Sequence, residues 1–153
     1  MDSEVIRIEP ANWLDLVALN KLSRICFEKD AWPWIDMLAA LLAPRAVPLK
    51  AVVGESNVIG YVIGDRRRPE LGWIASIAVH PDWRERGIGN RLMQEAEDRL
   101  GTPVVRLTLR QSNRAALQLY RQRGYRQVKT WPAYYHDGED GVVMERSLNQ
   151  DSF

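Results

Sequence analysis

The chain has a single cysteine, Cys26, among its 153 residues. One cysteine excludes an internal disulfide framework, and it fits the reducing cytoplasm, where we expect the protein to be found. The sequence also lacks any run of about 18 consecutive apolar residues, and no apolar segment follows its acidic beginning. These absences predict a soluble, cytoplasmic protein with no membrane partner.

An excess of charge of one sign is missing as well. The 21 basic and 20 acidic residues leave a net charge of +1 at pH 7, so no overall field favours binding to nucleic acid. The basic run Arg66-Arg67-Arg68 is expected in a solvated loop, with steering of an acidic peptide or RNA as the alternative. The two histidines, His80 and His136, have no cysteine partner and do not predict a metal site.

The length and apolar pattern predict one domain over residues 1–153. Alternating segments predict strands, and segments with a 3.6-residue period predict helices. The order of these segments, β-α-α-β-β-β-α-β-α-β-β, predicts an α/β fold in which helices cover a mixed sheet. The expected strands are 5–8, 47–53, 58–65, 73–79, 104–109, 125–130 and 142–146, and the expected helices are 10–27, 35–42, 88–100 and 113–123. Residues expected to face inward on the first helix are Trp13, Leu16, Val17, Leu19, Leu22 and Cys26.

The most informative segment is 77–93. A strand-like stretch ends at His80-Pro81, the spacing Arg-x-x-Gly-x-Gly follows at 84–89, and helical periodicity begins at Ile88. A helix start presents unpaired backbone N–H groups and the positive end of the helix dipole, and glycines let an anion approach them. The segment therefore predicts a phosphate-binding loop, and an ordinary tight turn between strand and helix is the alternative.

Two common phosphate loops do not fit this segment. A P-loop needs Lys followed by Ser or Thr after its last glycine, but Asn90 and Arg91 follow Gly89. A dinucleotide-binding loop needs a third glycine, where Leu92 stands. The remaining possibility is that the segment resembles the pyrophosphate loop of the GNAT family of acyl-CoA-dependent N-acetyltransferases.

A second segment, 107–125, carries the same resemblance. A strand is followed there by Ser-Asn at 112–113, then by Leu-Tyr at 119–120, then by Gly-Tyr at 124–125. The resemblance extends over almost the whole chain and is sharpest for enzymes of the ribosomal-protein-alanine N-acetyltransferase (RimI) type. It implies the GNAT fold, a mixed and mostly antiparallel sheet flanked by helices, with acetyl-CoA as cosubstrate and no metal.

The resemblance implies a role for each residue of the two segments. Backbone groups of Ile77, Ala78 and Val79 would align the pantetheine arm and polarise the thioester carbonyl. Asn113 would bind the same arm, or would serve only as a helix N-cap. Tyr120 would protonate the departing thiolate, or would serve only in packing. The residues implied for the pyrophosphate are Arg84, Glu85, Arg86, Gly87, Ile88, Gly89 and Asn90.

The acceptor side departs from the family pattern. Thr108 stands where the family carries a glutamate as general base, and threonine cannot accept a proton at neutral pH. The possible substitutes are Glu28, His136, Asp137 and a bound water. The aromatic residues implied to wall the amine-access groove are Trp32, Trp34, Tyr61, Tyr134 and Tyr135.

The missing base matters less for some acceptors than for others. An α-amine with a pKa of about 8 is roughly one-tenth neutral at pH 7, whereas deprotonating a lysine with a pKa of about 10.4 costs about 4.6 kcal/mol. We therefore expect direct acetyl transfer to a protein N-terminus, with a small-molecule amine or polyamine as the alternative acceptor. A non-catalytic acyl-CoA-binding module is the alternative of another class. The expected assembly is a monomer or a homodimer.

Overall fold

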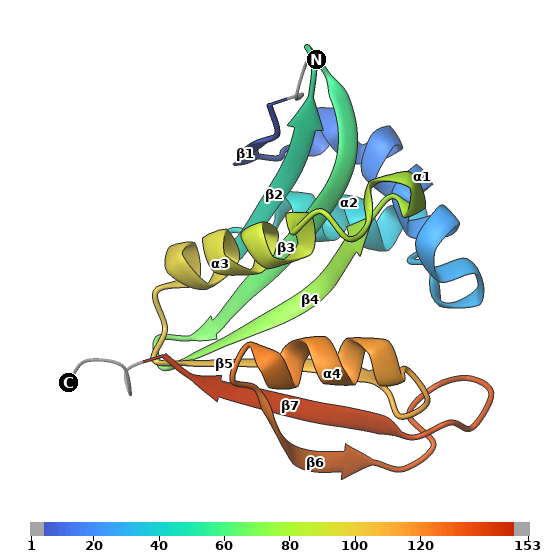
Figure 1. Ribbon diagram of the computed structural model, residues 1–153, viewed down its shortest axis with the longest axis vertical. Coiled ribbons are helices and arrows are strands. Elements are labelled where there is room, and N and C mark those ends of the chain that lie inside the picture. The colour runs from blue at the N-terminus through green and yellow to red at the C-terminus, as the bar shows by residue number, and fades with distance from the viewer. Residues whose placement is uncertain (1–4, 149–153) are drawn as a thin grey trace.

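The computed structural model describes residues 5–148, in which seven strands form one sheet with helices on both faces (Figure 1). The strands lie side by side in the order β1-β2-β3-β4-β5-β7-β6. This arrangement confirms the expected α/β architecture. The elements in chain order are β1 (Arg7–Pro10), the 3-10 turn η1 (Trp13–Asp15), α1 (Leu16–Phe27), the 3-10 turn η2 (Glu28–Asp30), α2 (Trp34–Leu42), β2 (Ala46–Val53), β3 (Asn57–Arg68), β4 (Leu71–Val79), the 3-10 turn η3 (Pro81–Trp83), α3 (Ile88–Leu100), β5 (Val104–Arg110), α4 (Arg114–Gln122), β6 (Arg126–Trp131) and β7 (Gly141–Ser147).

The sheet is mixed and mostly antiparallel, as predicted. Its neighbouring strands are antiparallel except β4 and β5, which are parallel and are connected through α3. Parallel neighbours cannot be joined by a tight hairpin, because the chain must return to the start of the first strand. The crossover helix α3 therefore begins beside the end of β4.

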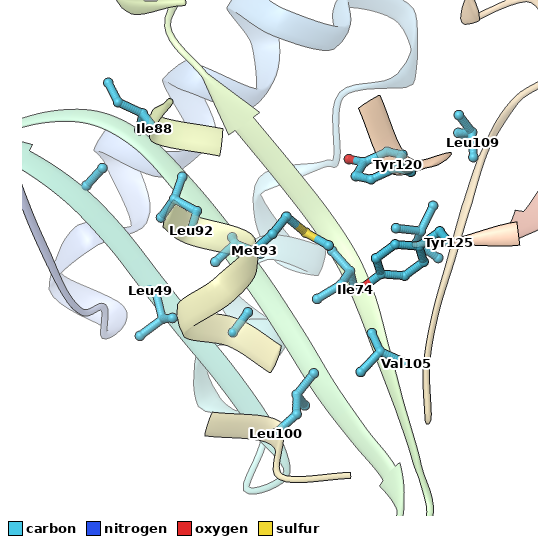
Figure 2. Close-up of a cluster of buried hydrophobic side chains, with 14 of the residues drawn as sticks. Leu49, Ile74, Ile88, Leu92, Met93, Leu100, Val105, Leu109, Tyr120 and Tyr125 are labelled. Atoms are coloured by element: carbon cyan, nitrogen blue, oxygen red, sulfur yellow. The ribbon is translucent and has the colours of Figure 1, made fainter. Parts of the chain in front are cut away.

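The helices cover the two faces of the sheet in pairs (Figure 1). On one face lie α3 and α4, and the larger core there includes Leu92, Met93 and Tyr120 (Figure 2). On the opposite face α1 and α2 cover a second core that includes Tyr61 and Ala78. Side chains alternate along a strand, so a central strand with helices on both faces is apolar throughout.

The crossover helix α3 has the bounds that the sequence predicts, residues 88–100. Glycines in the left-handed conformation stand at both ends, Gly87 with a φ of 78° and Gly101 with a φ of 61°. Such a conformation strains most other residues, so these glycines set the limits of the helix. Its buried apolar residues lie on one face: Ile88, Leu92, Met93, Ala96 and Leu100.

The first predicted helix is wrong in two respects. Residues 13–15 form a separate 3-10 turn before α1 begins. Trp13 and Val17 do not face inward, since they are 58% and 78% exposed. Trp13 precedes the helix, and Val17 lies two residues before buried Leu19, about 200° around the helix axis. The other residues expected to face inward are buried or partly buried: Leu16, Leu19, Leu22 and Cys26.

The basic run predicted as a loop is instead the end of β3. Arg66 pairs with Gly72 of β4, and Arg68 pairs with Leu71. The Arg66 side chain donates from Nε to the carbonyl oxygen of Leu100 at 2.7 Å, so it satisfies a carbonyl at the end of α3. Long basic side chains can keep their charged ends in water when the backbone is a strand, so three consecutive arginines do not by themselves indicate a loop. The predicted bounds of the other strands differ from the observed ones by one or two residues.

The packing of α3 on β3 gives the first testable prediction. Leu92 is fully buried and lies against Gly60, where a Cβ would come within 3.3 Å of its side chain. Leu92→Ala leaves a cavity that this close packing cannot fill, so the free energy of unfolding measured with urea should fall by about 2–5 kcal/mol. The control is Val17→Ala on the exposed side of α1, which should change stability by less than about 0.5 kcal/mol. Equal losses in the two variants would contradict this assignment of the core.

Candidate functional site

The sheet opens between β4 and β5. These strands pair only where residues 71–74 of β4 face residues 104–107 of β5. A register shift between Ile63 and Gly64 leaves Ala75 as an extra residue on β4, at the point where the pairing with β5 ends. Beyond this bulge, the edge of β4 that faces β5 has no strand partner within the described sheet. The end of β4, implied to hold the pantetheine arm, therefore has an edge whose backbone groups are not bonded to a strand, although the Val79 carbonyl on it accepts from Arg84 and Cys26.

The loop before α3 leaves the helix N-terminus uncapped. Glu85 and Gly87 have positive φ values of 64° and 78°, a backbone shape that turns neighbouring N–H groups toward one side. No side chain of the described residues caps the helix, and the first amide to find a helical acceptor is that of Arg91, which donates to Gly87 at 3.1 Å. The amides of residues 88–90 come before it and stay available to an anion.

Space in front of these amides is kept open at Gly89. A Cβ built there meets only the side chain of Val79, at 4.0 Å. The arginines of the loop contact the protein itself: Arg84 Nε donates to the Val79 carbonyl at 3.1 Å, and the Arg86 guanidinium lies 4.6 Å from the centre of the Trp83 ring. These contacts hold both arginines beside the loop while the helix amides remain uncovered.

Two further residues with implied roles lie at α4: Asn113, implied for the pantetheine arm, precedes the helix, and Tyr120, implied for the thiolate, lies within it. Asn113 is the N-cap, because its Oδ1 accepts from the amide of Ala116 at 3.2 Å. This confirms the capping role and leaves the side-chain NH2 group of Asn113 out of the cap. Tyr120 lies two helical turns later, 8% exposed, with its ring edge-on to that of Tyr125 and the ring centres 5.8 Å apart (Figure 2).

Burial changes what the Tyr120 hydroxyl can do. It raises the pKa of Tyr120 to about 12, against an opposing effect of the nearby Arg123 cation. Transfer of a proton from such a phenol to a thiolate of pKa about 8.5 is uphill by about 3.5 pK units, or about 5 kcal/mol. The hydroxyl has no hydrogen-bond partner within residues 5–148. It is therefore better suited to donate a hydrogen bond to a thiolate than to give its proton away.

A buried ion network fixes the end of α4. The Glu97 carboxylate on α3 is 2% exposed and accepts from Arg123 at 2.7 Å, from Arg146 at 3.0 Å and from the Tyr125 hydroxyl at 2.6 Å. A buried carboxylate with these partners is fully bonded, whereas removal of one partner would leave a costly charge. Because Arg123 directly follows α4, the network holds α4, and with it Tyr120, against α3.

A polar cavity of about 340 Å³ opens beside this network, between α3 and α4. It adjoins the first turn of α3, because Asn90 lies in that turn and lines the cavity. The cavity is lined by Asn90, Gln94, Leu119, Gln122, Arg123 and Arg146.

On the opposite face of the sheet, ion pairs join two segments that are distant in the sequence. Arg110, the last residue of β5, points away from the larger core because it alternates with buried Leu109. Its guanidinium bonds to Asp30 of η2 at 2.6 and 2.8 Å, and to Asp137 and Glu139 between β6 and β7 at 2.9 and 2.6 Å. The connection between α1 and α2 is thereby tied to the loop between β6 and β7.

Four of the five aromatic residues expected at the acceptor groove lie on or beside these two segments. Trp34 is 58% exposed and Tyr134 is 53% exposed, so both present ring surface to a ligand. The Tyr135 ring centre lies 4.3 Å from the Arg110 guanidinium. The four residues are Trp32, Trp34, Tyr134 and Tyr135.

Tyr61 does not join the other four. It is fully buried in the core under α1, and its hydroxyl lies 2.8 Å from Oγ of Ser76. Burial raises its pKa. An aromatic residue in a strand fits a groove and a core equally well by sequence, and here it is part of the core.

The candidates for the general base differ in their surroundings. A hydrogen bond from Lys29, together with Arg110, holds the pKa of Asp137 well below its usual range, so this carboxylate is a weak proton acceptor. Glu28 and His136 are both exposed. They remain candidates alongside a bound water.

Several residues of this side were not found from the sequence. The ion-pair partners Arg110, Asp30 and Glu139 lie far apart along the chain, and no local spacing marks them. Trp73 and Trp131 stack with ring centres 5.9 Å apart, and Trp131 in turn lies 5.2 Å from Tyr134. The richness of the chain in tryptophan, with six residues, was the one available signal of this aromatic surface.

Sequence comparison finds relatives over most of the chain. A sequence model of the Acetyltransferase (GNAT) family matches residues 13–125. The N-alpha-acetyltransferase daf-31 of Caenorhabditis elegans is 37% identical over 143 residues, which cover 88% of this chain and 78% of that protein. The N-alpha-acetyltransferase RimI of Mycobacterium tuberculosis is 34% identical over 127 residues, which cover 80% of each chain.

Solved structures share the fold. The ribosomal-protein-S18-alanine N-acetyltransferase from Escherichia coli has a TM-score of 0.85 at 23% identity, with 94% of both chains covered. The NAA60 protein of Arabidopsis thaliana in complex with acetyl-CoA has a TM-score of 0.83 at 20% identity, with 95% of this chain and 99% of that chain covered. At these identities the likeness establishes the architecture alone.

The family match places the protein in the class of α/β acyltransferases, and the gap between β4 and β5 with an uncapped helix N-terminus beside it fits that class. The chain belongs to the Acetyltransferase (GNAT) family, and it is an N-acetyltransferase. Within residues 5–148, no helix is both long enough and apolar enough to cross a membrane.

Proposed function

We propose that the protein transfers the acetyl group of acetyl-CoA to the N-terminal α-amine of another protein, acting in the cytoplasm as a single domain over residues 1–153. The observation that carries this proposal is the opening between β4 and β5, with the uncapped end of α3 on one face and the ion-paired acceptor segments on the other. The similarity to N-alpha-acetyltransferases of Caenorhabditis elegans and Mycobacterium tuberculosis supports the α-amine as the acceptor.

The residues on the α3 side fit acetyl-CoA. The free amides at 88–90 and the open space at Gly89 suit a pyrophosphate, because a helix N-terminus favours an anion that can come close to it. Residues 77–79 pair with β3 but not with β5, and on this open edge they offer backbone groups to the amides of the pantetheine arm. Asn113 contributes its side-chain NH2 group from the start of α4. When bound there, the thioester supplies an activated acetyl group.

The transfer that we propose is direct. The neutral amine nitrogen forms a bond to the acetyl carbon, the C–S bond breaks, and the amine loses one proton. Backbone groups at 77–79 polarise the carbonyl, and the Tyr120 hydroxyl donates to the leaving thiolate. The Cys26 thiol donates to the Val79 carbonyl at 3.4 Å and has no hydrogen bond to a base among the described residues, so a covalent acyl-enzyme is not required.

An α-amine also suits the absence of a carboxylate at position 108. Thr108 occupies the position two residues before Arg110, on the same face of β5. Because about one-tenth of an α-amine is already neutral at pH 7, orientation of the two substrates supplies most of the catalysis and a water can carry the released proton. An unperturbed lysine would have to lose its proton first, at a cost of about 4.6 kcal/mol.

The experiment that tests the function is a thiol-release assay with acetyl-CoA and a panel of acceptors. The panel contains peptides with a free N-terminus, the same peptides with a blocked N-terminus and an internal lysine, and small amines including polyamines. We expect turnover with the first group. Turnover confined to small amines would identify the alternative acceptor, and binding of acetyl-CoA without any turnover would indicate a non-catalytic module.

Gly89→Gln tests the location of the pyrophosphate. The side chain would lie in front of the helix amides, so the affinity for acetyl-CoA measured by calorimetry should fall at least about tenfold, or about 1.4 kcal/mol. The fold should survive, since a Cβ at this position meets only Val79 at 4.0 Å and glutamine favours a helix more than glycine does. Asp98→Gln, on the exposed side of the same helix, is the control and should bind normally. Normal binding by Gly89→Gln would contradict this location.

Tyr120→Phe tests the thiolate donor. The hydroxyl has no partner among the described residues, so its removal should leave the thermal midpoint and the affinity for acetyl-CoA nearly unchanged. The kcat should fall by about 100-fold, as is typical when a positioned donor is lost. If the variant keeps the wild-type kcat, Tyr120 is only a packing residue.

The pH dependence tests the absence of a strong base. With a peptide acceptor, kcat/KM should rise with pH along the titration of the α-amine, with an apparent pKa of about 8. Tyr120 adds no decline below pH 10, because a group with a pKa of about 12 stays protonated there. A plateau that begins near pH 6 would show that a residue of the protein acts as the base, and variants of Glu28 and His136 would then identify it.

A further inference from the structure

One guanidinium group bonds three carboxylates on the acceptor side of the sheet. Arg110 has a side chain that is only 15% exposed, and its Nε and Nη2 donate to the two oxygens of Asp30 at 2.6 and 2.8 Å. Such a bidentate pair fixes orientation as well as distance. Its Nη1 donates to Glu139 at 2.6 Å and to Asp137 at 2.9 Å. With Lys29, which donates to Asp137 at 2.8 Å, these residues form what we call the Arg110 cluster.

The Arg110 cluster connects three parts of the chain. Its carboxylates come from η2, which precedes the tryptophans at the start of α2, and from the loop between β6 and β7, which carries Tyr134 and Tyr135. The second oxygen of Glu139 accepts from the backbone amide of Ser112 at 2.7 Å. Ser112 directly precedes the N-cap of α4, so the loop between β6 and β7 is also fixed to the start of this helix.

The charges of the cluster depend on Arg110. Three carboxylates face two cations, and hydrogen bonds within the cluster and from Ser112 lower the pKa of all three carboxyl groups. They therefore stay ionised at neutral pH. Without Arg110, the exposed Lys29–Asp137 pair would be the remaining bond of the cluster between the two segments, and repulsion among the three carboxylates would loosen it. A lysine at the same position would keep the charge, but a single ammonium group cannot replace the planar fork of donors.

We propose that Arg110 is a positioning residue for the acceptor: by joining the two segments, it holds their aromatic side chains at the spacing that an incoming protein N-terminus requires. The Arg110 guanidinium also contacts one of these aromatic residues directly, since it lies 4.3 Å from the centre of the Tyr135 ring. The inference rests on the proposed function, since it concerns the acceptor of that reaction.

Arg110→Gln should change the KM for the acceptor peptide much more than the KM for acetyl-CoA. When Arg110 no longer connects η2 to the loop between β6 and β7, the KM for an acceptor peptide should rise at least about tenfold, because small displacements of the groups that position a substrate weaken its productive binding. The KM for acetyl-CoA should change by less than about twofold, because the helix amides at 88–90 belong to the other face. In Arg110→Lys, which keeps the positive charge, the KM for the acceptor peptide should lie between that of the wild type and that of Arg110→Gln.

Arg106→Gln is the matched control. Arg106 lies on the same face of β5 and has a comparable ion pair, with Nε 2.7 Å from a Glu145 oxygen, but its partner belongs to strand β7. This variant should lose stability without any change in the KM for the acceptor. If both variants raise the acceptor KM equally, or if Arg110→Gln raises the KM for both substrates alike, Arg110 has only a structural role.

Hydrogen exchange tests the same inference without any turnover. In Arg110→Gln, amide exchange should become faster in residues 28–34 and 132–140, and Arg106→Gln should leave these segments unchanged. Unchanged exchange in Arg110→Gln would overturn the inference. Inactivity of the wild-type enzyme toward every free N-terminus would instead overturn the proposed function. If Arg110→Gln does not fold, Asp30→Asn weakens the bonds between Arg110 and η2, leaves the Lys29–Asp137 pair in place, and should show faster exchange in residues 28–34.

Discussion

The organisation of the protein depends on the short pairing between β4 and β5. Four residues of each strand are paired, and the bulge at Ala75 then releases the rest of β4 from β5. Unpaired backbone groups in the middle of a sheet are costly unless something else bonds to them, with a penalty of about 1–3 kcal/mol for each unsatisfied group. A ligand that carries its own amides can satisfy them. The interruption of the sheet thus creates a binding surface that a continuous sheet would not have.

The surroundings of the opening are held rigidly by interactions of different kinds. On one face, close packing of α3 at Gly60 and the buried bonds of Glu97 set the positions of the helix N-terminus and of α4. On the other face, ion pairs of Arg110 set the position of two irregular segments. Apolar packing and the buried ion pairs of Glu97 respond little to ionic strength, whereas the more exposed ion pairs of the Arg110 cluster weaken as the ionic strength rises. The two sides therefore differ in how solution conditions affect them.

The sequence was most informative where the signals are local. The bounds of α3 were predicted correctly because its apolar periodicity is contiguous and glycines stand at both ends. The spacing at 84–89 is equally local, and its binding of a pyrophosphate stays a prediction. Tyr61 was assigned to the groove because alternation within a strand does not reveal what covers each face. The partners of Arg110 were not found, since Asp30 and Glu139 become its neighbours only when the sheet has formed.

The positions of the two sites relative to the sheet have a consequence for the order of events. The uncapped end of α3 and the segments joined by Arg110 lie on opposite faces. For the proposed reaction, each substrate has an entrance of its own, so neither has to leave before the other can bind. In that reaction the acetyl group would pass from one substrate to the other at the gap between β4 and β5. The sheet thus keeps the two entrances apart and leaves one place, the gap between β4 and β5, where the two substrates meet.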